Sequence, residues 1–590
     1  MHVGEQHSGP GDPPEVTTAQ RRETQLTRAQ PEETELAAGQ PGGGPGAAPP
    51  RRSRGRWAVA AACLALAVVM YAVLVRISQS WPMNSDGANN ALQAWDMIHG
   101  HLLLHGWIIG DASVCTFELP LYAVVEAIVG LHGVIFHLVA GLTYLIVMVF
   151  AAALAAAGSR GSAAVARCAV VIAVLAAPVV TDQGVSILLA APNHTGTSVF
   201  LLASFLLIDR APGWRFTPLL LGAILCVGEL GDATVAYIAV PAVLVVCAYR
   251  MAAARKIRSA DGKMAVATVV SIPLEYLIHA LMLHLGGYVM VQPKTSIVPP
   301  SQWPSHLVVT FRAVRTLFGA FGATVVPAHS ALSGAADLFG AACLLAAAFG
   351  LLKGLWRWTA ASPGEQLACA AVVINLVAYM VSTLPSTYSS REVVAVLPLG
   401  AALAARACVP RRIAGVERAG IAVAATAAAA VVPLAAALLT LPPAPAPAAP
   451  LAVWLRAHGL TYGIGGYWDS SSVTLQSRDQ VQVRAVVSVT AEAGKPGVPP
   501  ALWWGLGRLA PFYWETKADW YNPSAHDARF VIANGTYPDS APLSSAEVEH
   551  AFGPPAATYQ VAGREIMVYR TNLLKRLAPP VLPGPLGNGL

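Results

Sequence analysis

Long apolar runs alternate with short polar segments from Trp57 to about residue 441. A helix needs roughly 20 apolar residues to cross a bilayer, so the pattern predicts about eleven membrane-spanning helices, the first at 57–75 and the last at 421–441. The run 119–157 is too long for one upright helix. We therefore divide it near Gly130 into a helix at the membrane surface and a span that begins near Gly133.

Basic residues indicate the orientation of these spans. Arg51, Arg52, Arg54 and Arg56 immediately precede the first span, and Lys or Arg recurs in every second loop, whereas the first three loops on the opposite side contain neither. Short loops rich in Lys and Arg stay in the cytoplasm. The pattern therefore predicts a multi-pass plasma-membrane protein with a cytoplasmic N-terminus and an extracytoplasmic C-terminal domain.

The pattern changes on either side of the spans. The residues before the first span are rich in Gly, Pro, Gln and Glu, and such a segment buries too little apolar surface to fold. After the last span, alternation typical of strands occurs in VQVRAVVSV and REIMVYR. The expected order is a disordered cytoplasmic tail 1–56, a transmembrane domain 57–441 with a long first outer loop 77–120, a Pro/Ala linker 442–450, an extracytoplasmic α/β domain 451–577 and a loose tail 578–590.

The composition supports a polytopic membrane protein and argues against a nucleic-acid-binding protein. The chain has 590 residues, of which 55% are hydrophobic and only 12% charged, and its mean hydropathy is +0.54. The net charge of +6 comes from bases in short loops, so it does not indicate a nucleic-acid partner. The eight cysteines form no C-x-x-C pair. The fold class predicted is an all-α polytopic membrane protein with a small C-terminal α/β domain.

The first outer loop carries the densest set of chemically active side chains. It contains Asp86, Asp96, Asp111 and Glu118, with three histidines and no Lys or Arg. His101 and His105 are four apart, a spacing that can bind zinc on a helix. The pattern specifies no third ligand, so we expect these histidines to form hydrogen bonds at the membrane surface and predict no metal ligands.

Further ionisable residues from separate loops map to the same outer face. They are Asp182, His194, Glu229, Asp232, Arg391 and Glu392. For any one of them, solvation at a span end is an alternative to a functional role. Glu229 and Asp232 lie in a short turn between apolar segments, where charge usually faces a cavity or a partner. Being three apart, they would share one face of a helical turn.

The first loop resembles a known family in its order of residues. An acidic residue, Asp86, follows the first span, and an amphipathic helix then ends at Gly100. Gly106-Trp107 come next, and Glu118-Leu-Pro-Leu-Tyr122 begins the following apolar helix. This pattern is similar to the C-type (GT-C) glycosyltransferases, in particular their protein-mannosyltransferase and aminoarabinose-transferase branch. Ser390-Arg391 ahead of a Pro-containing span resembles the same family. Where the family often has two adjacent acidic residues, this chain has Asp86-Gly87.

The resemblance implies a GT-C-like fold and transfer of a sugar from a polyprenyl-phosphate donor. It implies Asp86 as the general base and a basic residue, Arg391 or Lys294, on the donor phosphate. The acceptor would be a glycan, a lipid or a protein, and a divalent cation is compatible with the reaction although no ligand for one is assigned. Residues expected to bind the sugar or the acceptor are Glu118, Asp182, His194, Glu229, Asp232, Trp107 and Tyr122.

Two other classes of function remain open. A transporter or flippase of a lipid-linked or polar substrate would also be polytopic, but transporters often contain internal repeats and spans broken near the midplane. We find no repeat, and the ionisable residues gather at one face. A scaffold that binds cell-wall glycan through its Trp-rich outer domain would not need Asp86.

Overall fold

The structure is a computed structural model. It describes residues 52–110, 112–190, 194–291, 295–320, 331–386, 389–409, 436, 439–440, 442–446, 448–490, 505–535 and 543–580. The described part of residues 1–61 is the beginning of helix α1. Residues 62–590 form one compact unit, and the fold and site below belong to it.

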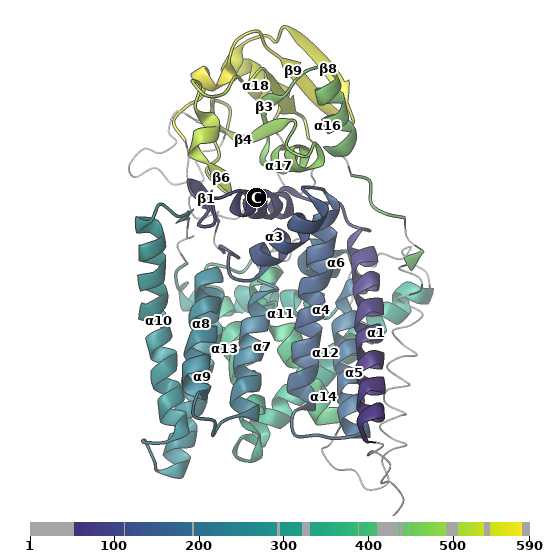
Figure 1. Cartoon of the computed structure of the whole chain (residues 1–590), viewed down its shortest axis with the longest axis vertical. Coiled ribbons are helices and arrows are strands. Elements are labelled where there is room, and N and C mark those ends of the chain that lie inside the picture. The colour runs from purple at the N-terminus through teal and green to yellow at the C-terminus, as the bar shows by residue number, and fades with distance from the viewer. Residues whose placement is uncertain are drawn as a thin grey trace, which may run out of the picture. The chain divides into compact units, whose positions relative to one another are not determined.

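Every predicted span up to residue 409 corresponds to a helix (Figure 1). Within the described residues, seven helical segments are long and apolar enough to cross a membrane. They are α1 (Arg52–Ser78), α4 (Val134–Ala156), α5 (Ser162–Ala176) with the turn η1 (Pro178–Val180), α9 (Thr234–Ala254), α10 (Ala260–His284), α12 (Ala331–Trp356) and α13 (Pro363–Val381). The structure also describes the shorter helices α7 (Thr197–Arg210), α8 (Thr217–Gly231) and α14 (Val396–Cys408). The predicted last span, 421–441, lies almost wholly outside the described residues, so the count of eleven stays a prediction.

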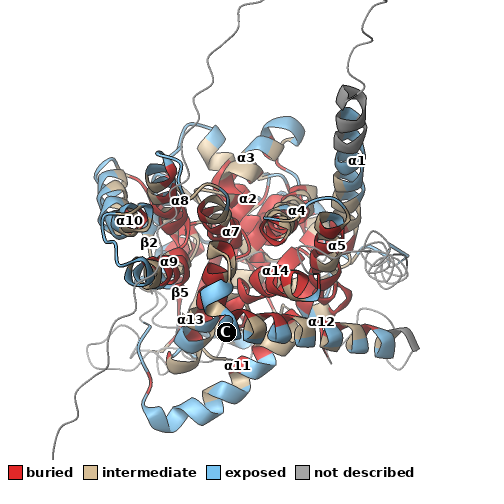
Figure 2. Ribbon diagram, turned by 90° about the horizontal axis from the view of Figure 1, so that it is seen from below, coloured by how far each residue is buried: buried red, intermediate tan, exposed pale blue. Residues whose placement is uncertain are grey.

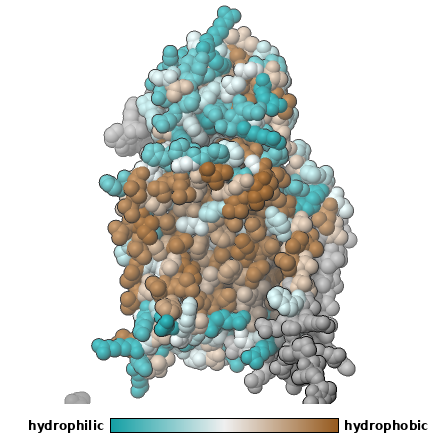
Figure 3. Space-filling view, in the orientation of Figure 1, coloured by the Kyte–Doolittle hydropathy of each residue, from teal (hydrophilic) through white to brown (hydrophobic). Residues whose placement is uncertain are grey.

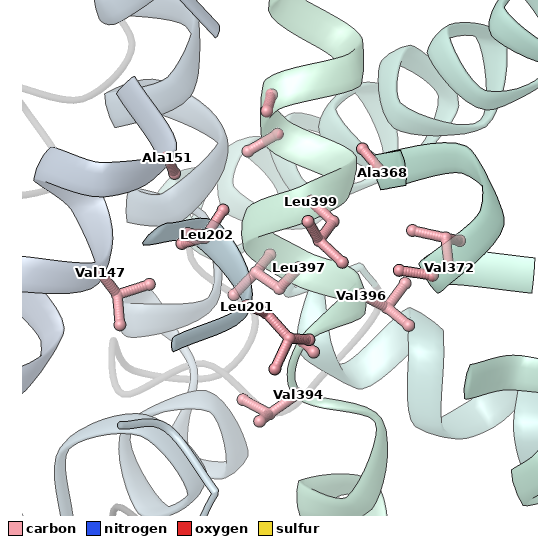
Figure 4. Close-up of a cluster of buried hydrophobic side chains, with 14 of the residues drawn as sticks. Val147, Ala151, Leu201, Leu202, Ala368, Val372, Val394, Val396, Leu397 and Leu399 are labelled. Atoms are coloured by element: carbon pink, nitrogen blue, oxygen red, sulfur yellow. The ribbon is translucent and has the colours of Figure 1, made fainter. Parts of the chain in front are cut away.

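The helices pack around an apolar centre. Val147, Leu201, Leu202, Leu397 and Leu399 meet there from α4, α7 and α14 (Figure 4). Seen from below, buried residues gather on α4, α5, α7 and α14, whereas α10 and α11 (Trp303–Leu317) are largely exposed (Figure 2). Apolar residues also cover the outer surface of these helices (Figure 3). A bundle that is apolar both inside and outside is suited to lipid rather than to water.

The first loop folds into two helices and a short strand. Helix α2 (Ser85–Ile98) begins at Asn84, whose side chain accepts a hydrogen bond from the backbone N–H of Gly87. Strand β1 (Trp107–Ile109) follows, and α3 (Glu118–Val129) then ends at Gly130, where φ is +71°. As predicted, the long apolar run is broken at this glycine, and α4 begins at Val134.

The C-terminal part contains a six-stranded sheet of order β5-β4-β3-β7-β9-β8. Its central strand β3 (Tyr462–Gly465) is parallel to β4 (Gln482–Val489) and to β7 (Phe530–Ala533), so that Ile464 pairs with Arg484 on one side and with Val531 on the other. The remaining strands are antiparallel: β5 (Arg508–Pro511), β8 (Ala557–Val561) and β9 (Arg564–Val568). The helices of this part are α16 (Ala448–Ala457), α17 (Tyr467–Gln476) and α18 (Ser545–Phe552). Both predicted strands are present, as β4 and β9.

A second sheet links the first loop to distant parts of the chain. Strand β1 pairs with β2 (Val289–Met290) and with β6 (Thr516–Lys517), in the order β2-β1-β6. Helix α2 also contacts α17, because Ser85 Oγ donates to the carbonyls of Tyr467 and Trp468 at 2.6 and 2.8 Å. We call the end of the helical bundle that carries these contacts the sheet-side end.

The other short elements of the described residues are α6 (Asp182–Val185), the π-helical turn η2 (Ser186–Ala190), η3 (Pro300–Gln302), η4 (Trp358–Ala360), η5 (Ser389–Val393), η7 (Ala518–Tyr521) and η8 (Leu573–Arg576). Of these, η5 supplies Arg391 and Glu392 to the candidate site.

Candidate functional site

A buried ionic cluster, made of His194, Asp232, Glu392, Glu118 and Thr197, lies at the sheet-side end. Nδ1 of His194 is 2.6 Å from Oδ2 of Asp232, and its Nε2 is 3.6 Å from Oε2 of Glu392. The hydroxyl of Thr197 also donates to Asp232. Only 5% of the His194 side chain is exposed, and 7% and 14% of the two carboxylate side chains. The cluster therefore holds His194, Asp232 and Glu392, which come from separate segments of the chain, largely out of water.

The charges of the cluster are mutually dependent. Burial alone would lower the pKa of His194, but the carboxylates of Asp232 and Glu392 outweigh it and raise this pKa well above its ordinary value. Burial likewise opposes ionisation of Asp232, yet the His194 cation and its hydrogen bond lower that pKa to about 2. Burial would also raise the pKa of Glu392, but the His194 cation outweighs it, so this pKa lies below its usual range. The histidine is a cation between two anions.

Glu118 joins the cluster from the first turn of α3. Its Oε1 accepts a hydrogen bond of 2.9 Å from the backbone N–H of Gly196, and it is 3% exposed. Burial, followed by the charge of Asp232, raises the pKa of Glu118 to about 8. At neutral pH this carboxyl is therefore predominantly protonated and can donate a hydrogen bond, unlike its two acidic neighbours.

The first loop is fastened to the end of α8 beside this cluster. Ala112 forms an isolated bridge with Asp232, and the N–H of Val114 donates to the carbonyl of Gly231 at 2.9 Å. A side chain on Gly231 would clash with Thr116, because a Cβ there would lie 2.2 Å from Oγ1 of Thr116. A glycine at the end of α8 therefore allows the loop to approach closely enough to deliver Glu118.

Asp86 and Arg391 are both partly exposed. Asp86 is half-buried in the first turn of α2, and its Oδ1 accepts a hydrogen bond of 2.6 Å from the hydroxyl of Tyr467. Nε of Arg391 is 3.6 Å from Oε1 of Glu392, and 37% of its side chain is exposed. Glu515 acts electrostatically on Tyr467, which contacts Asp86, and on Tyr122, which Glu118 also influences.

The structure separates Glu229 from Asp232, contrary to the expectation that they share a face. Helix α8 continues through Glu229 and ends at Gly231, so Asp232 is extended, with φ of −158°. Asp232 consequently turns to His194, whereas Oε1 of Glu229 accepts a hydrogen bond of 2.9 Å from Ser271 of α10. The (i, i+3) argument is wrong here because the helix stops between the two residues.

The other predicted residues have different surroundings. Trp107 is 1% exposed, packs edge-on against Trp520 and donates through Nε1 to Asp96 at 2.9 Å, so its ring is part of the core of the first loop. Asp182, in α6, is half-buried and outside the ionic cluster. Tyr122 is fully buried on the face of α3 that carries Glu118. Lys294 lies outside the residues that the structure describes.

Two contacts were not predicted from the sequence. Tyr467 and Lys517 come from the C-terminal part, and each contacts an aspartate of the first loop: Tyr467 contacts Asp86, and Nζ of Lys517 is 2.6 Å from Oδ2 of Asp96. No local pattern reveals such pairs, because they are separated by hundreds of residues. In the described part of the chain, no group of three or more His, Cys, Asp and Glu side chains is arranged to hold a metal ion.

Comparisons with known proteins define the class of the fold. No protein-family model matches the chain, and no curated protein matches its sequence. Among solved structures, ArnT from Cupriavidus metallidurans bound to undecaprenyl phosphate is similar, with a TM-score of 0.50 at 13% identity over 88% of this chain and 99% of that one. Apo ArnT gives 0.50 at 14% identity, over 89% of this chain and 100% of that one. The oligosaccharyltransferase of Archaeoglobus fulgidus gives 0.44 at 11% identity, over 80% of this chain and 69% of that one.

The likeness to ArnT shows that this chain has the GT-C fold, as the sequence predicted. The match extends over nearly all of both chains, so it includes the helical bundle and the C-terminal sheet together.

Proposed function

We propose that this protein is an integral membrane glycosyltransferase. It moves a sugar from a polyprenyl-phosphate donor to a glycan, lipid or protein acceptor at the outer face of the plasma membrane. The observation that carries the proposal is the likeness to ArnT along its whole length, since that protein was solved with undecaprenyl phosphate bound. The polar region at the sheet-side end, reached from an apolar helical surface, suits a donor with a lipid tail and a polar head (Figure 3).

Asp86 acts as the general base of this reaction. The acceptor hydroxyl attacks the anomeric carbon, the bond from that carbon to the phosphate oxygen breaks, and Asp86 accepts the hydroxyl proton. A carboxylate within hydrogen-bond reach of the acceptor suits this task, because the proton leaves as the new bond forms. One displacement of this kind inverts the configuration at the anomeric carbon. Asp86 is half-buried at the start of α2.

The departing lipid phosphate gains negative charge and needs a cation. Arg391 supplies it through a guanidinium that can hold two phosphate oxygens, and Lys294 is the second cation that we assign to this phosphate. The exposed part of the Arg391 side chain and its neighbour Glu392 support this assignment, because the ion pair orients the guanidinium at the edge of the ionic cluster.

The remaining predicted residues bind the substrates or support the residues that do. Glu118 and Tyr122 line the buried face of α3, and His194 and Asp232 fix Glu392 beside Arg391. Asp182 and Glu229 lie outside the ionic cluster, and we assign them to contact with an acceptor or a lipid headgroup. Trp107 is buried and donates a hydrogen bond to Asp96. We therefore assign it a structural role in the first loop rather than stacking on a sugar.

The test is transfer of radiolabelled sugar from polyprenyl-phosphate donors in membranes that contain the wild type, Asp86→Asn or Asp527→Asn. Asp527 is a surface carboxylate paired with Arg529 and serves as the matched control. We expect the control to resemble the wild type and Asp86→Asn to lose about 100-fold or more, the range typical of a general base. Equal transfer by all three proteins would exclude Asp86 as the base.

A further inference from the structure

The contact between Tyr467 and Asp86 joins the proposed base to the C-terminal sheet. Tyr467 follows the carboxyl end of β3, two residues after Gly465, and is the first residue of α17. Strand β3 lies between two parallel neighbours, β4 and β7, which the chain reaches on opposite sides. In open α/β sheets, the carboxyl ends of strands at such a reversal are where ligands bind. Here that edge lies against the start of α2.

The hydroxyl of Tyr467 is held in one orientation. It donates to Oδ1 of Asp86 at 2.6 Å and accepts from Nδ2 of Asn89, one turn further along α2, at 3.3 Å. Its ring is fixed by edge-on contacts with Trp468 and Phe512, at centroid distances of 5.1 and 5.4 Å. The two bonds from Ser85 to the carbonyls of Tyr467 and Trp468 hold the helices together beside it.

We propose that Tyr467 is a positioning residue, through which the C-terminal sheet orients the carboxylate of Asp86 toward the acceptor hydroxyl. This inference rests on the proposed function. The bond from Tyr467 fixes the position of Oδ1, so the orientation of the Asp86 carboxylate depends on the C-terminal sheet. The carboxylate cannot rotate without breaking the bond to Tyr467.

The charges around the tyrosine keep it a donor. Asp86 faces it from α2 and Glu515 from the segment before β6, and burial together with these anions raises the pKa of Tyr467 well above its ordinary value. The phenol therefore keeps its proton throughout the pH range of an assay. A neutral donor stabilises the ionised form of the carboxylate that it contacts.

The test compares Tyr467→Phe with Tyr521→Phe in the transfer assay. Tyr521 is an equally suitable buried tyrosine of the C-terminal part, whose hydroxyl donates to the backbone carbonyl of Ala485 at 2.6 Å. Phenylalanine keeps the ring contacts in both variants. We expect Tyr467→Phe to lower kcat about 10- to 100-fold with little change in the donor KM, the size of effect that a misplaced catalytic group produces. The acid limb of its pH–rate profile should move to higher pH, and Tyr521→Phe should match the wild type in all three measurements.

Two results would overturn the inference while leaving the proposed function intact. In the first, Tyr467→Phe has the same kcat and the same pH profile as the wild type, whereas Asp86→Asn is inactive. The other is an equal loss of rate in both phenylalanine variants with unchanged pH profiles, which would show a structural role. If the wild type transfers no sugar, or Asp86→Asn transfers as well as the wild type, the proposed function fails and this inference with it.

Discussion

Nδ1 of His194 lies 2.6 Å from Oδ2 of Asp232, and both side chains are more than nine-tenths buried. His194 comes from the loop before α7 and Asp232 from the end of α8, so the pair ties two loops together at the sheet-side end. Because Glu392 contacts the other ring nitrogen, η5 is tied to the same point. This ion pair sets the geometry on which Glu118 and Arg391 depend.

Loss of one charge from this pair should be strongly destabilising. Asp232→Asn leaves the His194 cation buried with a weaker partner, and breaking a buried pair from one side costs about 3–5 kcal/mol. Thermal unfolding of purified protein in detergent measures the effect. Asp527→Asn, on the surface, should change the unfolding free energy by less than about 0.5 kcal/mol. Similar unfolding temperatures for the two variants would contradict a buried ion pair at His194.

Glu118 should make the stability depend on pH. Its pKa is raised from 4.5 to about 8, so the folded protein holds a proton that the unfolded chain releases. The stabilising contribution of this proton is complete below pH 4.5 and is lost as pH rises through about 8, at roughly 1.4 kcal/mol per pH unit between them. Glu118→Gln keeps a neutral side chain at every pH. The unfolding free energy of this variant should therefore fall less steeply as pH rises.

The measurement is the difference in unfolding temperature between wild type and variant from pH 5 to pH 9. Glu549→Gln, at an exposed position of α18, is the control and should follow the wild type throughout. Parallel curves for Glu118→Gln and the wild type would show that Glu118 is ionised in the folded protein.

A methyl group at Gly196 should displace Glu118 without straining the backbone. Gly196 has φ of −65°, which alanine adopts readily, but its Cβ would lie 2.1 Å from Oε1 of Glu118. We expect Gly196→Ala to lower the unfolding free energy by about 1–3 kcal/mol, as overpacking of a buried site does, and to reduce sugar transfer. At Gly213 a Cβ would meet nothing within 4 Å, so Gly213→Ala is the matched control. If Gly196→Ala transferred sugar as fast as the wild type, a role for Glu118 in the site would be contradicted.

The first loop and the C-terminal part should be energetically coupled through Asp96 and Lys517. Hydrogen bonds from Lys517, His101 and Trp107 outweigh the burial that opposes ionisation, and the pKa of Asp96 lies below its usual range. This contribution is present above the ordinary pKa of aspartate and disappears as pH falls through the lowered value. A double-mutant cycle of Asp96→Asn and Lys517→Met should give a coupling energy of about 1–3 kcal/mol.

The surface pair Asp527–Arg529 provides the comparison for this cycle. Its side chains are 51% and 44% exposed, against 19% and 16% for Asp96 and Lys517. Exposed pairs contribute about 0.2–1 kcal/mol. Equal coupling energies in the two cycles would mean that β1 and β6 are held by their backbone pairing alone.

The sequence predicts those features of the fold that depend on local pattern. Apolar runs and basic loops locate the helices, Gly130 marks the break before α4, and alternation locates β4 and β9. The parallel pairing of β3 with β4 and β7 could not be predicted, because it depends on contacts between segments far apart in the chain. The same is true of β1 with β6, where a two-residue strand has no pattern of its own.

The sequence predicts which residues belong to the candidate site better than it predicts which of them contact one another. A single membrane face for Glu118, His194, Asp232 and Arg391 follows from the order of the spans, and the structure brings all four to the region of one ionic cluster. The divergence of Glu229 from Asp232 depends on where α8 ends, and helix ends are poorly defined by sequence. The contact of Tyr467 with Asp86 depends on how α17 packs against α2, which only the folded chain reveals.

The most direct test of the central claim is the stoichiometry between sugar transferred and polyprenyl phosphate released. Donor labelled in both the lipid and the sugar would be supplied to proteoliposomes containing the wild type or Asp86→Asn, and both products would be separated and counted. Our account predicts one polyprenyl phosphate for each sugar joined to the acceptor, with both falling together by about 100-fold or more in Asp86→Asn. Donor that crosses the membrane intact, with no polyprenyl phosphate released by the wild type, would contradict it and indicate a transporter.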